Sequence, residues 1–253
     1  MNYPIIEFFD EPAIIGEQKY KFVNEKELLK KYNIDTVLFV FRKEVKELIQ
    51  NPDLLEDFFD FSNSSATYKC YIYNKKFLVA VSPVGAPSAT LMMEAFFFMG
   101  IKNFYACGSC GRISEEIESD KFLLVEKAIR SEGVSYHYLK PSIYAETDKE
   151  LSDNLAKYLD NSNLPYKRSI VWTTDGFFRE TNSEILVRKQ QGAIGVEMEC
   201  ASWCAVAKYR KIKFAQLLYF SDTVKKKEWK LHDSIQESRK AIINVMIDYL
   251  NNL

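Results

Sequence analysis

The chain has 253 residues, of which 47% are hydrophobic and 27% charged, a composition typical of a globular protein that excludes disorder as the main state. Its 34 basic and 35 acidic residues give a formal net charge of −1, so we expect no nucleic-acid partner, because such binding needs a concentrated positive surface. The longest apolar segment, residues 91–99, is interrupted by Glu94 and is too short to cross a bilayer, so we expect no membrane contact.

Short apolar runs alternate with helical patterns through the first half. We expect strands at 36–41 (TVLFVF), 103–107 and 122–129, a hairpin of 67–73 with 77–81 around Asn74-Lys75-Lys76, and helices at 43–50 and 88–99. Pro87 at the start of the second helix and Gly100 at its end agree with the usual placement of these residues at helix termini.

The second half continues the alternation. We expect helices at 148–159, 183–190, 200–209 and 234–250, and strands at 167–172, 193–196 and 214–220. Strands interleaved with helices predict an α/β fold, a three-layer αβα sandwich with a mixed, mainly parallel central sheet. No linker composition interrupts the pattern, so we expect a single domain over residues 1–253.

Ligands of such sheets bind beyond the carboxyl ends of the strands, and four segments qualify. The first is Val84-Gly85-Ala86-Pro87-Ser88, where a small-residue loop feeds a helix N-terminus and could hold an anion; an ordinary strand-to-helix turn is the alternative. The second is the segment 106–111 (ACGSCG), in which Gly108 and the hydroxyl of Ser109 could approach a ligand closely.

The cysteines of the second segment allow two other interpretations, a redox pair or half of a zinc site. We favour packing cysteines that flank a ligand turn, because no helix directly follows Cys110, and Cys200 and Cys204 are spaced like one face of a helix. We therefore expect no metal. Five cysteines without a signal-peptide pattern indicate a reduced compartment, and we expect a cytoplasmic location.

The third segment is Val196-Glu197-Met198-Glu199-Cys200, where a carboxylate at a strand end could accept hydrogen bonds from vicinal hydroxyls. Its alternative is an acidic residue that complements a helix dipole. The fourth is Phe220-Ser221-Asp222, where an aspartate leaving a buried strand suits general-acid chemistry; a helix N-cap is its alternative.

Taken in order, these segments resemble the nucleoside phosphorylase family, in its purine nucleoside phosphorylase and uridine phosphorylase branch. The similar segments lie between about Phe77 and Asp222, and the most specific are 192–210 (GAIGVEMECASWCAVAKYR) and the Ser-Asp pair that closes the next strand. The resemblance implies cleavage of a nucleoside N-glycosidic bond, usually with phosphate as co-substrate and no other cofactor.

The resemblance also implies roles for individual residues. Glu199, with Met198 and Glu197, would bind the ribose, and Phe177 and Arg179 would contact the base. Asp222 would protonate a purine as the bond breaks. Phosphate, or a water in its place, would lie against four further residues, Gly85, Gly108, Ser109 and Arg130.

The chain departs from the family pattern at the expected phosphate site. Ala106 stands where most relatives of this branch place an arginine, and no clear counterpart of their N-terminal phosphate loop follows 36–41. An alanine cannot replace a bidentate guanidinium clamp. Three arginines could substitute, Arg42, Arg112 or Arg130, or water could be the acceptor, as in the nucleosidases of the same fold.

The leading hypothesis is therefore a nucleoside phosphorylase that cleaves a purine nucleoside with phosphate to give the free base and ribose 1-phosphate. A phosphate-independent nucleosidase and a nucleoside-binding protein without catalysis are the alternatives. The expected ligands are a nucleoside and phosphate. The resemblance further implies a homo-oligomer, a homodimer or hexamer.

Overall fold

The computed structural model describes residues 8–11, 13, 22–48, 52–62, 66–225 and 228–253. The strands are β1 (Thr36–Val40), β2 (Leu55–Ser62), β3 (Thr67–Tyr73), β4 (Phe77–Val81), β5 (Asn103–Arg112), β6 (Phe122–Ser131), β7 (Tyr144–Glu146), β8 (Tyr166–Thr174), β9 (Ala193–Glu197), β10 (Lys213–Lys225) and β11 (Glu228–Leu231). The helices are α1 (Val23–Tyr32), α2 (Arg42–Leu48), α3 (Ala86–Met99), α4 (Ser135–Tyr138), α5 (Lys149–Asn161), α6 (Asn182–Gln190), α7 (Cys200–Arg210) and α8 (Ile235–Asn251), with short 3-10 turns η1 (Pro52–Leu54) and η2 (Phe177–Arg179).

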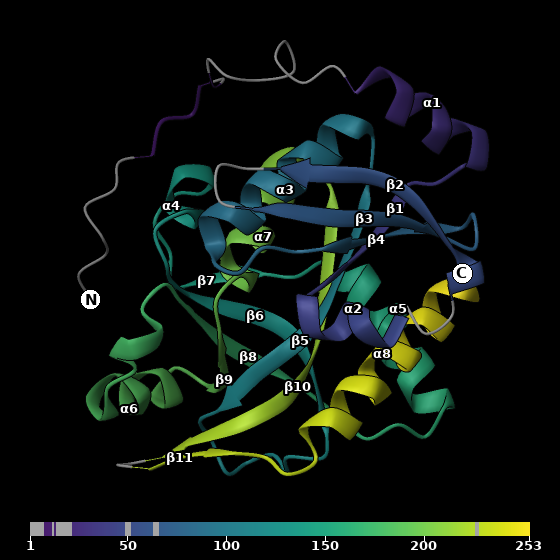
Figure 1. The fold of residues 1–253 in the computed structure, drawn as a ribbon. Helices are drawn as coiled ribbons and strands as arrows, with labels where there is room; N and C mark the ends of the chain where they lie inside the picture. The colour runs from purple at the N-terminus through teal and green to yellow at the C-terminus, as the bar shows by residue number, and fades with distance from the viewer. Residues whose placement is uncertain (1–7, 12, 14–21, 49–51, 63–65, 226–227) are drawn as a thin grey trace.

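One mixed sheet contains all of these strands, in the order β11-β10-β6-β8-β9-β5-β1-β4-β3-β2, with β7 beside β6 (Figure 1). Strand β10 pairs with β5 as well as with β6, so that β10, β6, β8, β9 and β5 form a closed ring. The parallel pairings join β1 to β4 and β5, β10 to β5, and β8 to β6 and β9, whereas β2, β3, β7 and β11 pair antiparallel. The predicted mixed α/β sheet is confirmed, with its parallel pairings among the middle strands.

Helices cover the sheet on two sides, which confirms the predicted three layers (Figure 1). One core contains buried residues of α3 and α7, including Phe96 and Trp203. The other contains buried residues of α2, α5 and α8, including Leu155 and Met246. Burial of these apolar side chains supplies the main driving force for assembling the layers.

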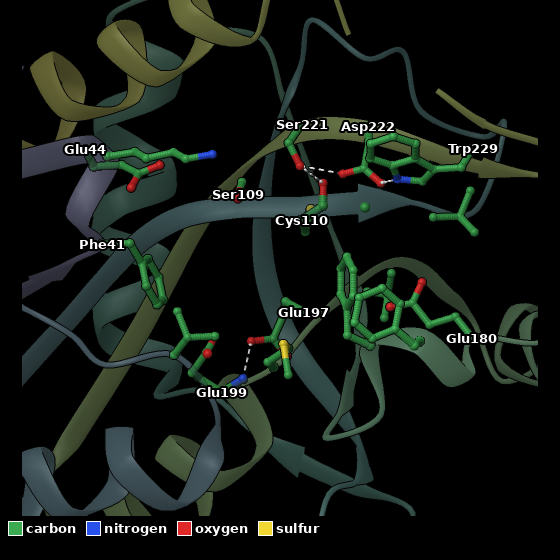
Figure 2. A pocket seen from close by; sticks show the side chains of 18 of the residues that line it. Phe41, Glu44, Ser109, Cys110, Glu180, Glu197, Glu199, Ser221, Asp222 and Trp229 are labelled. Carbon is green, nitrogen blue, oxygen red and sulfur yellow. Dashed lines mark hydrogen bonds between the residues drawn. The ribbon is translucent and has the colours of Figure 1, made fainter. Parts of the chain in front are cut away.

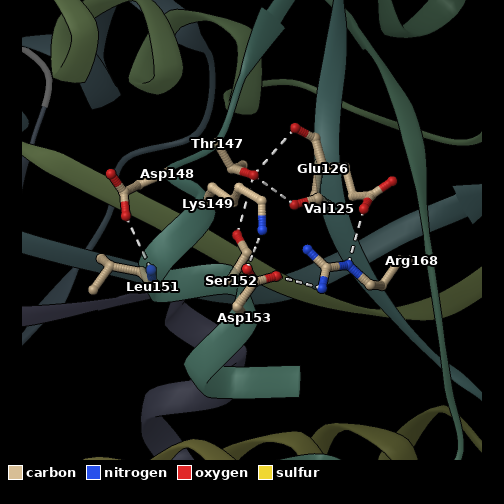
Figure 3. Close-up of polar contacts among 9 residues, drawn as sticks. All are labelled: Val125, Glu126, Thr147, Asp148, Lys149, Leu151, Ser152, Asp153 and Arg168. Carbon is tan, nitrogen blue, oxygen red and sulfur yellow. Dashed lines mark hydrogen bonds and ion pairs between the residues drawn. The ribbon is translucent and has the colours of Figure 1, made fainter. Parts of the chain in front are cut away.

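Helix α5 is fixed to the sheet by polar contacts at its first turns (Figure 3). Asp148 accepts a 2.9 Å hydrogen bond from the amide of Leu151 and so caps the helix. The Arg168 guanidinium on β8 bridges Glu126 of β6 (2.9 Å) and Asp153 of α5 (2.6 Å). These contacts hold α5 across the middle of the sheet, on the side opposite to α7.

The local turn and cap predictions are confirmed. The β3–β4 hairpin turns at Asn74 and Lys75, whose φ angles of 46° and 56° are left-handed. Helix α3 has Pro87 in its first turn and ends at Gly100, whose φ of 106° is easily adopted by glycine. The helix predicted at 43–50 is α2, and the last two predicted residues lie outside the described part of the chain.

Two predictions about strand ends are wrong. Strand β5 continues to Arg112, so Gly108 and Ser109 lie within a strand and not in a ligand turn. Strand β10 continues to Lys225, so Asp222 lies inside it rather than beyond its end. Both extensions arise because β5 and β10 pair with each other in parallel, with a bulge between Phe220 and Asp222 that re-aims the chain there.

All five cysteines are buried and free, in agreement with the packing interpretation. Within the described ranges, no group of three or more His, Cys, Asp or Glu side chains has the arrangement of a metal site. No helix in the described part of the chain has the length and apolarity needed to cross a membrane.

Candidate active site

A cavity of about 700 Å³ opens where β1, β5, β9 and β10 end, with η2 and β11 along its rim (Figure 2). Six residues predicted for the site line it: Ser109, Phe177, Glu197, Met198, Glu199 and Asp222. They come from four separate segments of the chain, and the fold brings them together. Figure 2 shows Phe41 and Glu44 at one end, Asp222 and Trp229 at the other, and Ser109 between them.

Two predicted glycines are not among the lining residues. Gly85 has a φ of 92°, and its amide donates a 2.6 Å hydrogen bond to Glu199 Oε1, so this helix N-terminus receives a protein carboxylate. Gly108 lies under the ring of Phe41, and a Cβ added at Gly108 would lie 2.7 Å from that ring. The absence of a side chain at Gly108 therefore leaves room for the Phe41 ring.

Two of the predicted arginines, Arg179 and Arg130, also lie outside the cavity lining, whereas Arg42 is part of it. Arg179 is exposed. Arg130 is buried, and its guanidinium donates to the hydroxyls of Ser135 (2.8 Å) and Ser142 (2.7 Å) and to the carbonyls of Leu139 and Lys140. These four acceptors occupy the fork that a phosphate would need, so Arg130 organises the segment after β6.

Glu197 and Glu199 lie side by side at the junction of β9 and α7 but make different contacts. Glu197 accepts hydrogen bonds from the Thr173 hydroxyl (2.5 Å) and from the amides of Glu199 (2.8 Å) and Cys200 (2.7 Å). Both of its oxygens are therefore used within the protein, which makes Glu197 an anchor for the start of α7. The Glu199 carboxylate is the one held toward the cavity by Gly85.

Burial places this carboxylate pair in an unusual electrostatic state. Desolvation raises the pKa of Glu197 well above its ordinary value, although its three hydrogen bonds oppose the shift. The pKa of Glu199 is raised further, first by desolvation and then by the charge of Glu197. Such raised pKa values are common where carboxylates serve a function, because stability alone does not favour them.

Asp222 is held on both of its oxygens. The Ser221 hydroxyl donates to Oδ1 (2.5 Å), and the indole Nε1 of Trp229 donates to Oδ2 (2.9 Å). Gly111 on the neighbouring strand leaves room for this carboxylate, since a Cβ there would lie 3.3 Å from Asp222 Oδ2 and 3.0 Å from Val196. A carboxyl group oriented in this way inside a cavity is suited to exchange a proton with a bound molecule.

Glu44, Glu180 and Trp229 are among the lining residues that were not predicted from the sequence. Glu44 is buried, accepts a 2.7 Å hydrogen bond from the Tyr219 hydroxyl and faces Arg239 at 3.6 Å. Glu180 follows η2, and Trp229 reaches the cavity from β11. Glu180 directly follows the predicted Arg179, so its place in the sequence was a partial indication that it belongs to the site. Glu44 and Trp229 reach the cavity only through tertiary contacts, which no local sequence pattern indicates.

Comparison with known proteins identifies the family. Residues 36–251 match the phosphorylase superfamily. The chain belongs to this superfamily. It is 25% identical over 167 residues to "Purine nucleoside phosphorylase DeoD-type 1" of Shewanella oneidensis, covering 65% of this chain and 71% of that protein. The superfamily contains nucleoside phosphorylases and nucleosidases, and the chain is a distant member of it.

Solved structures share the superfamily fold. A uridine phosphorylase from Vibrio fischeri aligns with a TM-score of 0.70 at 19% identity, covering 86% of this chain and 92% of that one. A 5′-methylthioadenosine/S-adenosyl homocysteine nucleosidase from Campylobacter jejuni aligns with a TM-score of 0.71 at 20% identity, covering 87% and 99%. A phosphorylase and a nucleosidase thus share the fold of this chain.

Proposed function

We propose that this phosphorylase-superfamily chain cleaves the N-glycosidic bond of a purine nucleoside and transfers the ribosyl group to water. The observation that carries the proposal is the arrangement of one cavity, with Asp222 at one end, Glu44 at the other, Ser109 between them and Glu199 also in its wall. A nucleoside has the same order of parts: a base, a sugar, and the face of the sugar that an acceptor attacks.

Ribose would bind at Glu199 and Met198. The carboxylate can accept hydrogen bonds from vicinal hydroxyls, and the thioether packs against the apolar face of the ring. The base would then extend toward Phe177 and Asp222, with the phenyl ring as a stacking surface.

Asp222 would act as the general acid. A purine carries an accepting nitrogen, N7, on its five-membered ring, and protonation there turns the departing base into a neutral molecule. As the bond breaks, positive charge develops on the ribosyl carbon, and nearby carboxylates stabilise this charge. Asp222 thus favours a purine over a pyrimidine.

Water is proposed as the acceptor because the phosphate clamp expected in this branch is missing. Ala106 is buried within β5, Phe41 covers Gly108, and Arg130 is fully engaged by its own loop. The carboxylate of Glu44 lies at the Phe41 end of the cavity, where it could accept a hydrogen bond from water. Ser109 would be the second contact of that water.

Phosphate is the second candidate acceptor, and the cations in the cavity wall favour it. Arg42 and Lys43 line the same cavity and are exposed, so two cations are available to an anion bound there. The curated relative cited above is itself a phosphorylase by name.

The test is base release from adenosine, inosine and uridine, each with and without phosphate. The proposal predicts that both purine nucleosides are cleaved without phosphate and that uridine is not. Release that requires phosphate would establish phosphorolysis. Ligand-induced thermal stabilisation without turnover would establish a binding protein and refute catalysis.

We also propose a homo-oligomer, a homodimer or hexamer. Phe178 on η2 is 93% exposed beside the cavity and packs edge-to-face with Phe177. An exposed aromatic pair at a site rim is characteristic of a surface that a partner covers. Light scattering measures the mass of the assembly, and a monomer at micromolar concentration would contradict the proposal.

A further inference from the structure

Glu180 is a carboxylate in the cavity wall that the proposed cleavage chemistry does not use. It follows η2 and lies at the end of the cavity where Asp222 and Trp229 are found (Figure 2). Within the described part of the chain, Glu180 has no hydrogen-bond or ion-pair partner, although its side chain is only partly exposed. A partly buried carboxylate without a partner is costly, and its presence in a cavity points to a ligand group.

The charged groups that act on Glu180 are both acidic. They are Asp222 on β10 and Glu184 on α6, whose charges reach the Glu180 carboxyl group. Burial raises the pKa of Glu180 to about 7, and these two negative charges contribute to the shift. Glu180 therefore changes its charge near neutral pH, and it is an acceptor when ionised and a donor when protonated.

The chemistry of a purine determines what Glu180 would meet. N7 and the substituent at C6 lie on the same edge of the base, so a residue beside the one that contacts N7 contacts the 6-substituent. In an aminopurine that substituent is a hydrogen-bond donor, and in an oxopurine it is an acceptor. If Asp222 contacts N7, Glu180 lies at the same end of the cavity as that edge of the base.

We propose that Glu180 is a specificity-determining residue that selects 6-aminopurine nucleosides over 6-oxopurine nucleosides by accepting a hydrogen bond from the 6-amino group. This inference rests on the proposed function, because it uses Asp222 at N7. The ionised carboxylate faces the oxygen of an oxopurine with no hydrogen between them, which disfavours that substrate. The protonated form donates to the same oxygen, so the preference weakens as the pH falls.

The experiment compares kcat/KM for adenosine and inosine between about pH 5.5 and 8 in the wild type and in Glu180→Gln. The adenosine-to-inosine ratio of the wild type is expected to rise at least about tenfold over this range, the worth of one hydrogen bond to a charged group. A pH effect on the cleavage step itself is common to both substrates and cancels in the ratio. In Glu180→Gln the ratio becomes independent of pH, because an amide both donates and accepts.

Glu237→Gln is the matched control, since Glu237 is an exposed carboxylate on α8 that does not line the cavity. It is expected to keep the pH-dependent ratio of the wild type. A wild-type ratio that does not change with pH, or a Glu180→Gln ratio that still changes, would overturn the assignment while leaving nucleoside cleavage intact.

Calorimetric binding of adenine and hypoxanthine separates this inference from the proposed function. Ionised Glu180 is expected to favour adenine at pH 8 by about tenfold, and Glu180→Gln to lose that preference, whether or not the protein turns over. If no nucleoside is cleaved but this binding pattern is found, the proposed catalysis fails and the role of Glu180 stands. Equal binding of the two bases at pH 8 would refute it.

Discussion

The indole of Trp229 donates a 2.9 Å hydrogen bond to Oδ2 of Asp222, the carboxylate that we propose as the general acid. The two residues are held together by the antiparallel pairing of β11 with β10, in which Asp222 lies opposite Leu231. Because Ser221 occupies the other oxygen, the carboxyl plane is fixed from both sides before a substrate binds.

Replacing Trp229 by phenylalanine tests this positioning. Trp229→Phe keeps an aromatic surface in the cavity wall but removes the Nε1 donor, so kcat for adenosine is expected to fall about tenfold with little change in KM. Steady-state kinetics measure both parameters. An unchanged kcat with a raised KM would instead identify Trp229 as a stacking surface only.

Asp222→Asn tests the acid directly. The amide retains the shape of the side chain but cannot give up a proton to the base, so kcat for base release is expected to fall about 10²–10⁴-fold. Adenine binding measured by calorimetry should persist, which shows that the site is intact. Wild-type turnover in this variant would show that Asp222 is not the general acid.

The buried carboxylate pair predicts an unusual dependence of stability on pH. The pKa of Glu199 is higher in the folded protein than its ordinary value of 4.5, so the folded state binds the proton more tightly than the unfolded state does. This contribution to stability is therefore lost as the pH rises from about 4.5 toward 8.

Glu199→Gln removes this titration while its amide oxygen can still accept from Gly85. Its free energy of unfolding, relative to that of the wild type, is expected to increase by about 1–3 kcal/mol between pH 5 and pH 8.5. Urea unfolding at the two pH values measures the change, with Glu237→Gln as the surface control. An equal difference at both pH values would show that Glu199 is ionised throughout.

Arg130 separates a structural role from a phosphate-binding one. A lysine cannot satisfy the four acceptors that surround the guanidinium, so Arg130→Lys is expected to lose about 2–4 kcal/mol of stability. At a temperature where the variant is folded, its kinetics should match those of the wild type. Full stability combined with altered kinetics would instead indicate that Arg130 binds a substrate.

Much of the fold could be predicted because its signals are local. The left-handed Asn74 and Lys75 of the β3–β4 hairpin and the Pro87 and Gly100 limits of α3 follow from the conformational preferences of single residues. The pairing of β10 with β5 and β11 depends on residues far apart in the chain, and no local pattern encodes it. The predicted ends of β5 and β10 were therefore wrong.

The site was predictable to a similar extent. The segments that resemble the nucleoside phosphorylase family predicted Ser109, Met198, Glu199 and Asp222 as site residues. All four line the cavity. Side chains added by the particular packing of this chain, Glu44 behind Tyr219 and Trp229 on β11, have no motif around them. The same packing explains why Gly108 and Arg130 serve the protein rather than an anion.

The most direct test of the account identifies the sugar product when adenosine is cleaved in phosphate buffer. If water is the acceptor, free ribose forms in equal amount with adenine, at a rate that does not change with phosphate concentration. Ribose 1-phosphate as the sugar product, formed at a rate that rises with phosphate and vanishes without it, would contradict the account.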